Sequence, residues 1–246
     1  MLSVLLATLR LIGILASSIL LLMCLAIASF HPQLRAALTS VCFRWLLFVC
    51  GIQLKCKIPM SELRARIRTV IVANHVSYLD VIVVGALRPC LFLAKEEVRS
   101  WPVFGWVAQA LGCVFVRRET LMGRANALRR CLSHARLNDI ALFPEGTTTA
   151  APLPDLKVWA KGHAWIAQRA EVDSILCLGL IYENQAERAW TDDMSLLPHL
   201  FKTLGQLKTC ITVTGAWVPV HQSLRPAQLA FTTHEQLCLA VHYECS

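Results

Sequence analysis

The stretch Val70-Ile71-Val72-Ala73-Asn74-His75-Val76-Ser77-Tyr78-Leu79-Asp80 passes from an uncharged apolar run into a polar turn. A short run of this kind is typical of a buried strand. Ser77 and Asp80 then have the spacing of a helix capping box, and apolar residues continue to Leu87. The stretch therefore predicts a strand, a turn and a helix, with His75 in the turn at the carboxyl end of the strand.

Short apolar runs alternate with helical stretches along most of the chain. Strands are predicted over residues 69–73, 91–94, 113–116, 140–143, 175–181 and 210–216. Helices are predicted over residues 77–87, 106–111, 121–137 and 157–169. Because such alternation is typical of α/β domains, we expect a single mostly parallel sheet flanked by helices.

Two apolar runs precede this domain. Residues 11–30 carry no charge and are long enough, as a helix, to cross a bilayer core of about 30 Å. Residues 36–52 are also apolar but contain Arg44, which favours a helix lying in the membrane interface, or a hairpin that enters one leaflet. We therefore expect residues 1–52 to form N-terminal membrane-anchoring helices and residues 53–246 to form the α/β domain.

A secretory signal peptide is the alternative interpretation, because Ala26-Ile27-Ala28 resembles a cleavage site. Only Arg10 precedes the first run, however, and the run is long for a signal peptide, so an anchor is favoured. The basic residues that follow predict a domain on the cytoplasmic side of the membrane, the inner membrane if the cell is bacterial. They are Arg35, Arg44, Lys55, Lys57, Arg64 and Arg66.

The composition narrows the class of partner. Hydrophobic residues make up 56% of the 246 residues, and the formal net charge is +8. The basic residues are scattered and accompany an apolar N-terminus, which indicates anionic lipid rather than nucleic acid. The 11 cysteines include no C-x-x-C pair, so we expect buried, reduced thiols in a reducing compartment, and no metal site.

His75 and Asp80 are the first candidates for catalysis. A carboxylate at one imidazole nitrogen fixes the tautomer and leaves the other nitrogen as a base. The plain structural alternatives are a turn histidine that bonds the backbone and an aspartate that caps the helix. The spacing alone does not separate these interpretations.

Two later segments also end predicted strands. Gly112-Cys113-Val114-Phe115-Val116-Arg117-Arg118 finishes with two arginines, which bind phosphate or carboxylate well. Phe143-Pro144-Glu145-Gly146-Thr147-Thr148-Thr149 supplies a turn with a glycine and three hydroxyls. Each is an ordinary strand end or turn by itself, but all three strand ends can meet at one edge of a parallel sheet.

Together the three segments resemble the PlsC-type glycerophospholipid acyltransferase family, whose ordered pattern is N-H-x-S-x-x-D, G-x-x-F-x-x-R and F-P-E-G-T-x-S. The resemblance implies that His75 is the base and Asp80 its orienting partner. It also implies an acceptor-headgroup site, with Lys95 as a weaker candidate for binding a phosphate. The residues implied for that site are Arg118, Glu145, Gly146 and Thr147.

By the same resemblance, the reaction is transfer of a fatty acyl group to the free hydroxyl of 1-acylglycerol-3-phosphate, which gives phosphatidic acid. The donor would be an acyl thioester on coenzyme A or acyl carrier protein, with no further cofactor. The implied partners are the bilayer and the lysolipid acceptor.

The sequence departs from the family pattern in three places. Thr149 stands where serine is usual, and Cys177 stands where a proline is expected in an apolar strand. The usual phenylalanine-lysine-glycine segment appears as residues 159–164, after an insert with Pro152 and Pro154. Thr149 preserves the hydroxyl, and Cys177 bears on details of the donor channel rather than on the chemistry.

A narrower resemblance concerns the acceptor. Residues 188–200 and 74–119 look like segments of bacterial lyso-ornithine lipid acyltransferases. That resemblance implies acylation of lyso-ornithine lipid to ornithine lipid instead, with no phosphate on the acceptor.

Two rivals come from other classes. A lipid hydrolase could use the same His75–Asp80 pair on water, although the chain has no G-x-S-x-G serine elbow. A non-catalytic membrane-binding module is the second rival. Nucleotide binding is disfavoured, because neither the P-loop nor the Rossmann glycine pattern occurs.

Overall fold

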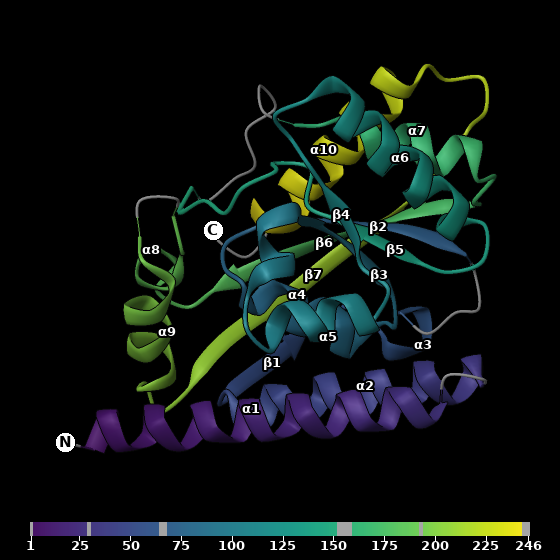
Figure 1. Ribbon diagram of the computed structural model, residues 1–246. Coiled ribbons are helices and arrows are strands. Elements are labelled where there is room, and N and C mark those ends of the chain that lie inside the picture. Colours follow the sequence, from purple (N-terminus) through teal and green to yellow (C-terminus); the bar gives the residue numbers. More distant parts are fainter. Residues whose placement is uncertain (1, 29–30, 64–67, 152–158, 192–193, 243–246) are drawn as a thin grey trace.

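The computed structural model describes residues 2–28, 31–63, 68–151, 159–191 and 194–242 (Figure 1). Within these residues a seven-stranded sheet has the order β1-β7-β6-β2-β5-β3-β4. Every neighbouring pair is parallel except β6 and β7, so the expected single, mostly parallel sheet is confirmed. The strands are β1 (Ile52–Cys56), β2 (Thr69–Ala73), β3 (Leu91–Lys95), β4 (Val114–Val116), β5 (Ile140–Leu142), β6 (Ser174–Tyr182) and β7 (Thr209–Pro219).

Helices cover both faces of the sheet (Figure 1). One face is covered by α4 and α5, with α1 and α2 beyond them, and the other face by α6, α7 and α10. The described helices are α1 (Leu2–Ile27), α2 (Pro32–Val49), α3 (Met60–Leu63), α4 (Leu79–Leu87), η2 (Glu96–Ser100), α5 (Phe104–Ala110), α6 (Leu121–Ala135), α7 (Gly162–Arg169), α8 (Gln185–Arg188), α9 (Leu196–Leu204) and α10 (Pro226–His242).

Strand β2 lies inside the sheet between β6 and β5, and all five of its residues are buried. Its side chains alternate between two apolar clusters. Ile71 and Ala73 belong to the cluster shared with α2 and α4, and Val70 and Val72 to the cluster shared with α6, α7 and α10. Burial on both faces explains the continuous apolar run, and it fixes the position of the turn that follows.

The N-terminal helices are antiparallel and packed together, since Trp45 Nε1 donates to Ser17 Oγ at 2.9 Å. Within the described residues α1 alone is long and apolar enough to cross a membrane. It begins at Leu2 rather than at Leu11, so that Arg10 lies inside it. Arg10 donates to backbone carbonyls at the end of α9 and just beyond it, and Arg44 Nε donates to the carbonyl of Ala86 at 3.4 Å. The charged side chains of Arg10 and Arg44, within α1 and α2, therefore contact other parts of the protein.

Several boundaries differ from the sequence prediction. Helix α4 begins at Leu79, not Ser77, because the capping box is only half formed: the carboxylate of Asp80 accepts from the backbone N–H of Ser77, but Tyr78 is the N-cap and has no side-chain cap. Strand β1 begins at Ile52, the last residue of the second apolar run, and was not predicted, nor were α9 and α10. Helix α7 begins at Gly162, and residues 157 and 158 of the predicted helix lie outside the described residues.

Candidate active site

Residues 74–80, here called the His75 turn, connect β2 to α4. Asn74 joins the turn to β6: its Nδ2 donates to the carbonyl of Leu180 at 2.9 Å, and its Oδ1 accepts from the N–H of Leu180 at 2.7 Å. The side-chain amide thus takes the place of the backbone hydrogen bonds between β2 and β6 where β2 ends. It holds the start of the turn in one position.

Asp80 is fully buried, and four donors surround its carboxylate. Oδ2 lies 2.8 Å from His75 Nδ1 and accepts from the backbone N–H groups of Val76 at 2.7 Å and Ser77 at 2.9 Å. Oδ1 accepts from the hydroxyl of Tyr182 at 2.5 Å. A buried carboxylate satisfied in this way is a rigid anion beside the imidazole.

The side chain of His75 is 19% exposed and stacks on the ring of Phe143, with centroids 4.1 Å apart. Since Nδ1 faces the carboxylate, the hydrogen-bond network assigns the proton to Nδ1 and leaves Nε2 as a base. The arrangement has the geometry required for general-base catalysis on a hydroxyl.

The turn after β5 is bonded directly to the His75 turn. Glu145 is buried, and its Oε1 accepts from the backbone N–H of His75 at 3.0 Å. The N–H of Thr149 donates to the carbonyl of His75 at 2.8 Å. Glu145 therefore supports the backbone of the base, a contact that its implied place in the headgroup site did not predict.

Arg118 follows β4 and reaches the same turn. Gly146 has φ +77°, and a Cβ added there would lie 3.7 Å from Arg118 Nη1, so the guanidinium lies over the glycine. Lys95 ends β3 and pairs in register with Val116 of β4, which places it at the same sheet edge. Thr147 lies in the turn beside Gly146, partly buried. The structure thus brings the strand ends that carry the implied headgroup residues to the His75 turn.

Sequence reasoning missed several polar side chains around this turn. Tyr182 ends β6 and is buried, and burial followed by the nearby Asp80 raises its pKa well above the usual value, so its hydroxyl remains a donor. Tyr78 contacts Trp190 and His199 from the segment that carries α8 and α9. The only sequence signal for Tyr182 was a tyrosine at the end of a buried strand, which needs a polar partner.

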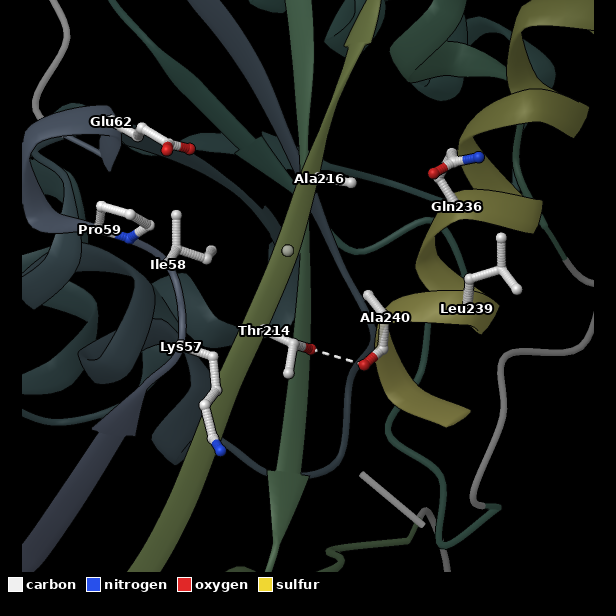
Figure 2. Close-up of a pocket in the computed structure, with 10 residues that line it drawn as sticks. Lys57, Ile58, Pro59, Glu62, Thr214, Ala216, Gln236, Leu239 and Ala240 are labelled. Atoms are coloured by element: carbon white, nitrogen blue, oxygen red, sulfur yellow. Dashed lines mark hydrogen bonds between the residues drawn. The ribbon is translucent and has the colours of Figure 1, made fainter. Parts of the chain in front are cut away.

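A pocket of about 400 Å³ lies elsewhere, between α10, β7 and the chain after β1 (Figure 2). Lys57 and Glu62 line one side, Gln236 and Leu239 line the other, and Thr214 Oγ1 donates to the carbonyl of Ala240 at 2.8 Å. None of the predicted site residues lines it. The candidate active site is the His75 turn instead, because His75 and the buried carboxylate of Asp80 are in contact there.

A family model described as acyltransferase matches residues 57–181, which is half of the chain and includes all three sequence segments. The chain belongs to this acyltransferase family. The His75 turn, Arg118 and the turn at Glu145 all fall within the matched residues.

Curated members of the family show similarity over shorter stretches. A lyso-ornithine lipid O-acyltransferase of Pseudomonas aeruginosa is 40% identical over 105 residues, which are 43% of this chain and 40% of that protein. Its counterpart in Rhizobium meliloti is 33% identical over 161 residues, 58% and 54% of the two chains. A 1-acyl-sn-glycerol-3-phosphate acyltransferase of Neisseria meningitidis is 37% identical over 81 residues, 32% of each chain. These matches span about half or less of each relative's length.

The fold also has a solved counterpart. The crystal structure of the 1-acyl-sn-glycerophosphate acyltransferase PlsC from Thermotoga maritima superposes with a TM-score of 0.66. The superposition covers 96% of this chain and 98% of that one, with 16% sequence identity. The acyltransferase fold therefore extends over nearly the whole chain, including the N-terminal helices.

Proposed function

We propose that this protein is a lysolipid O-acyltransferase that uses an acyl thioester, on coenzyme A or acyl carrier protein, as its donor. The observation that carries the proposal is the 2.8 Å contact between His75 Nδ1 and the buried carboxylate of Asp80. It leaves Nε2 on a partly exposed ring, where an acceptor hydroxyl can reach it. No further cofactor enters the proposal.

In this mechanism His75 Nε2 takes the proton of the acceptor hydroxyl as the oxygen attacks the thioester carbonyl. The carboxylate of Asp80 stabilises the imidazolium that forms. The tetrahedral intermediate then breaks its carbon–sulfur bond, and the departing thiolate takes the proton from His75. One ester forms and one thioester is lost, so no covalent acyl-enzyme is needed.

Two acceptors fit the proposal. Acylation of 1-acylglycerol-3-phosphate to phosphatidic acid agrees with the basic residues Lys95 and Arg118 at the site edge. Acylation of lyso-ornithine lipid is favoured by a separate observation: the similarity to lyso-ornithine lipid acyltransferases extends over 105 to 161 residues, against 81 for the phosphate-directed relative. Both acceptors carry a hydroxyl and an anionic group.

The N-terminal helices support a position in the plane of a membrane. Helix α1 packs along its length against α2, α5 and α9, so it could not cross a bilayer without burying these elements too. Its outer face is apolar, with Leu5, Leu9, Ile12 and Leu20 more than half exposed. The exposed Lys55 nearby favours the cytoplasmic side.

The proposal is tested with purified protein, one acyl thioester, and each lysolipid in turn, with products identified by mass. We expect His75→Ala to lower acyl transfer by at least about 100-fold while the protein stays folded and bound to vesicles. His221→Ala, at an exposed histidine, is the matched control and should retain full activity. Near-normal transfer by the His75 variant, or release of free fatty acid in place of the diacyl product, would contradict the proposal.

A further inference from the structure

The segment that carries α8 and α9 is fastened to the His75 turn. The backbone N–H of Trp190 donates to the carbonyl of Val76 at 3.0 Å, and Thr148 Oγ1 donates to the carbonyl of Trp190. The ring of Trp190 also packs edge-on against Tyr78 and Trp101. This segment follows β6 in the chain, and in the sheet β6 lies on one side of β2 while β3 and β4 lie on the other. Lys95 ends β3, and Arg118 follows β4.

Arg188, two residues before Trp190, is a buried cation without a counter-ion among the residues that the structure describes. Its side chain is buried, and within the described residues Nε has no hydrogen-bond partner. A guanidinium normally enters a protein interior paired with an anion, because removing its hydration is costly. The residual exposure of 8% leaves part of this side chain open to a ligand from solution.

His199, on α9, supplies a second donor of the same kind. Its Nδ1 lies 3.2 Å from the hydroxyl of Tyr78. A neutral imidazole that accepts from this hydroxyl carries its proton on Nε2. That Nε2 is buried and, among the described residues, also lacks a hydrogen-bond partner.

Arg188 and His199 both lie close enough to Tyr78 to influence it or be bonded to it. Burial raises the pKa of Tyr78 to about 12, and the charge of Arg188 is among the influences that lower it again. Burial lowers the pKa of His199, its interaction with the backbone carbonyl of Ala189 raises it, and the charges of Lys202 and Arg188 lower it further. The positive charge of Arg188 thus acts on both side chains.

We propose that Arg188 and His199 form a receptor for the anionic group of the acceptor headgroup, a phosphate monoester or a carboxylate. The inference rests on the proposed function, because the site adjoins the His75 turn and would hold a headgroup beside the base. A planar guanidinium and an imidazole N–H together match two oxygens of either anion. Bound there, the anion supplies the partner that both buried donors lack.

The test measures binding without the acyl donor, so that it does not depend on catalysis. Lysophosphatidate, lyso-ornithine lipid and uncharged monoacylglycerol are titrated in dodecylmaltoside micelles against wild type and Arg188→Met. We expect Kd to rise about tenfold to a hundredfold for one or both of the lysolipids that carry an anionic group, and Kd for monoacylglycerol to change less than about twofold. The anion whose binding weakens identifies the source. His199→Phe should weaken the same ligand, and Arg129→Met, on the exposed face of α6, should not.

Two results would overturn the proposed receptor. One is that wild type and Arg188→Met bind each lysolipid with equal Kd; the other is that wild type binds neither lysolipid with an anionic group more tightly than monoacylglycerol. A thermal melt distinguishes a binding role of Arg188 from a structural one. Arg188→Met should melt at or above the wild-type temperature, because it removes a buried charge that no partner stabilises. A lower melting temperature counts against the proposal. If wild type binds the anionic lysolipid through Arg188 but transfers no acyl group to it, the receptor stands and the proposed function fails.

Discussion

Asp80 receives more hydrogen bonds than its pairing with His75 requires. Two backbone N–H groups fix Oδ2 within the turn, and Tyr182, from a different strand, fixes Oδ1. Such a network sets the negative charge that the imidazole experiences, because each donor withdraws some of it. Tyr182 therefore acts on His75 through the carboxylate, as a positioning residue.

Tyr182→Phe tests this role. Without the hydroxyl, Oδ1 of Asp80 loses the hydrogen bond from Tyr182, and the carboxylate is held less firmly beside His75. We expect kcat to fall about tenfold with little change in KM, because Tyr182 is buried behind the carboxylate. The matched control is Phe231→Tyr on the exposed face of α10, which should leave both constants unchanged. An unchanged kcat in Tyr182→Phe contradicts the role.

The residues of the site differ in how far the sequence could predict them. His75 and Asp80 are five positions apart in one turn, so their meeting could be expected from local structure. Tyr182 meets Asp80 across 102 positions, and only the parallel pairing of β6 with β2 brings them together. Arg188 could not be predicted as a binding residue, because nothing in the local sequence indicates that its guanidinium is buried.

At the scale of elements, α7 is held to α10 by a buried polar contact. His163 on α7 is almost fully buried; its Nε2 lies 2.7 Å from the hydroxyl of Thr233 on α10, and its Nδ1 lies 2.9 Å from the carbonyl of Ala160. Burial lowers the pKa of His163 from 6.5 to about 4 and outweighs the opposite effect of the hydrogen bond to the carbonyl of Ala160. The folded protein therefore binds this proton less readily than the unfolded chain does.

That difference predicts a loss of stability in acid. Because the folded pKa is the lower one, the stabilisation is complete above about pH 6.5 and is lost as the pH falls towards 4. The full loss is about 3 kcal/mol. We expect His163→Gln to unfold with a shallower dependence on pH between 6.5 and 4 than wild type, in urea titrations at fixed pH. His221→Gln should follow wild type, and parallel curves for the His163 variant would refute the argument.

Helices and strands could be predicted where their buried residues form a clear and isolated apolar pattern in the sequence. Strand β2 was predicted residue for residue, since both of its faces are buried and its apolar run stands alone. Strand β1 was missed because it is short and half exposed, and Gln53 and Lys55 leave no continuous apolar run. Helix α10 was missed because its buried side chains, including Thr233 and Leu237, give only a weak apolar stripe.

At the scale of the molecule, α9 links the candidate active site to α1, whose exposed side chains are apolar. This helix packs against α1, where Gly205 after its last turn lies close to the backbone of Ser3. Its preceding segment is bonded to the His75 turn through Trp190. A headgroup held near α9 would thus have its acyl chain beside the apolar face of α1, which fits an acceptor that stays in the membrane.

The outer face of α1 should provide the binding energy for that membrane. Leu9 and Ile12 of α1 are each 58% exposed, and α1 runs along one edge of the molecule (Figure 1). Replacing both by glutamate removes apolar area and adds charge, so we expect partitioning onto phosphatidylcholine vesicles to fall at least about 100-fold in flotation assays. The control pair, Leu121→Glu with Leu137→Glu, changes leucines that are still more exposed, 79% and 83%, at the start of α6 and just after its end. Helix α6 covers the opposite face of the sheet, so this variant should float like wild type. Activity on a lysolipid presented in detergent should persist in both double variants, because neither reaches the His75 turn. Unchanged flotation of the α1 variant would mean that another surface meets the bilayer.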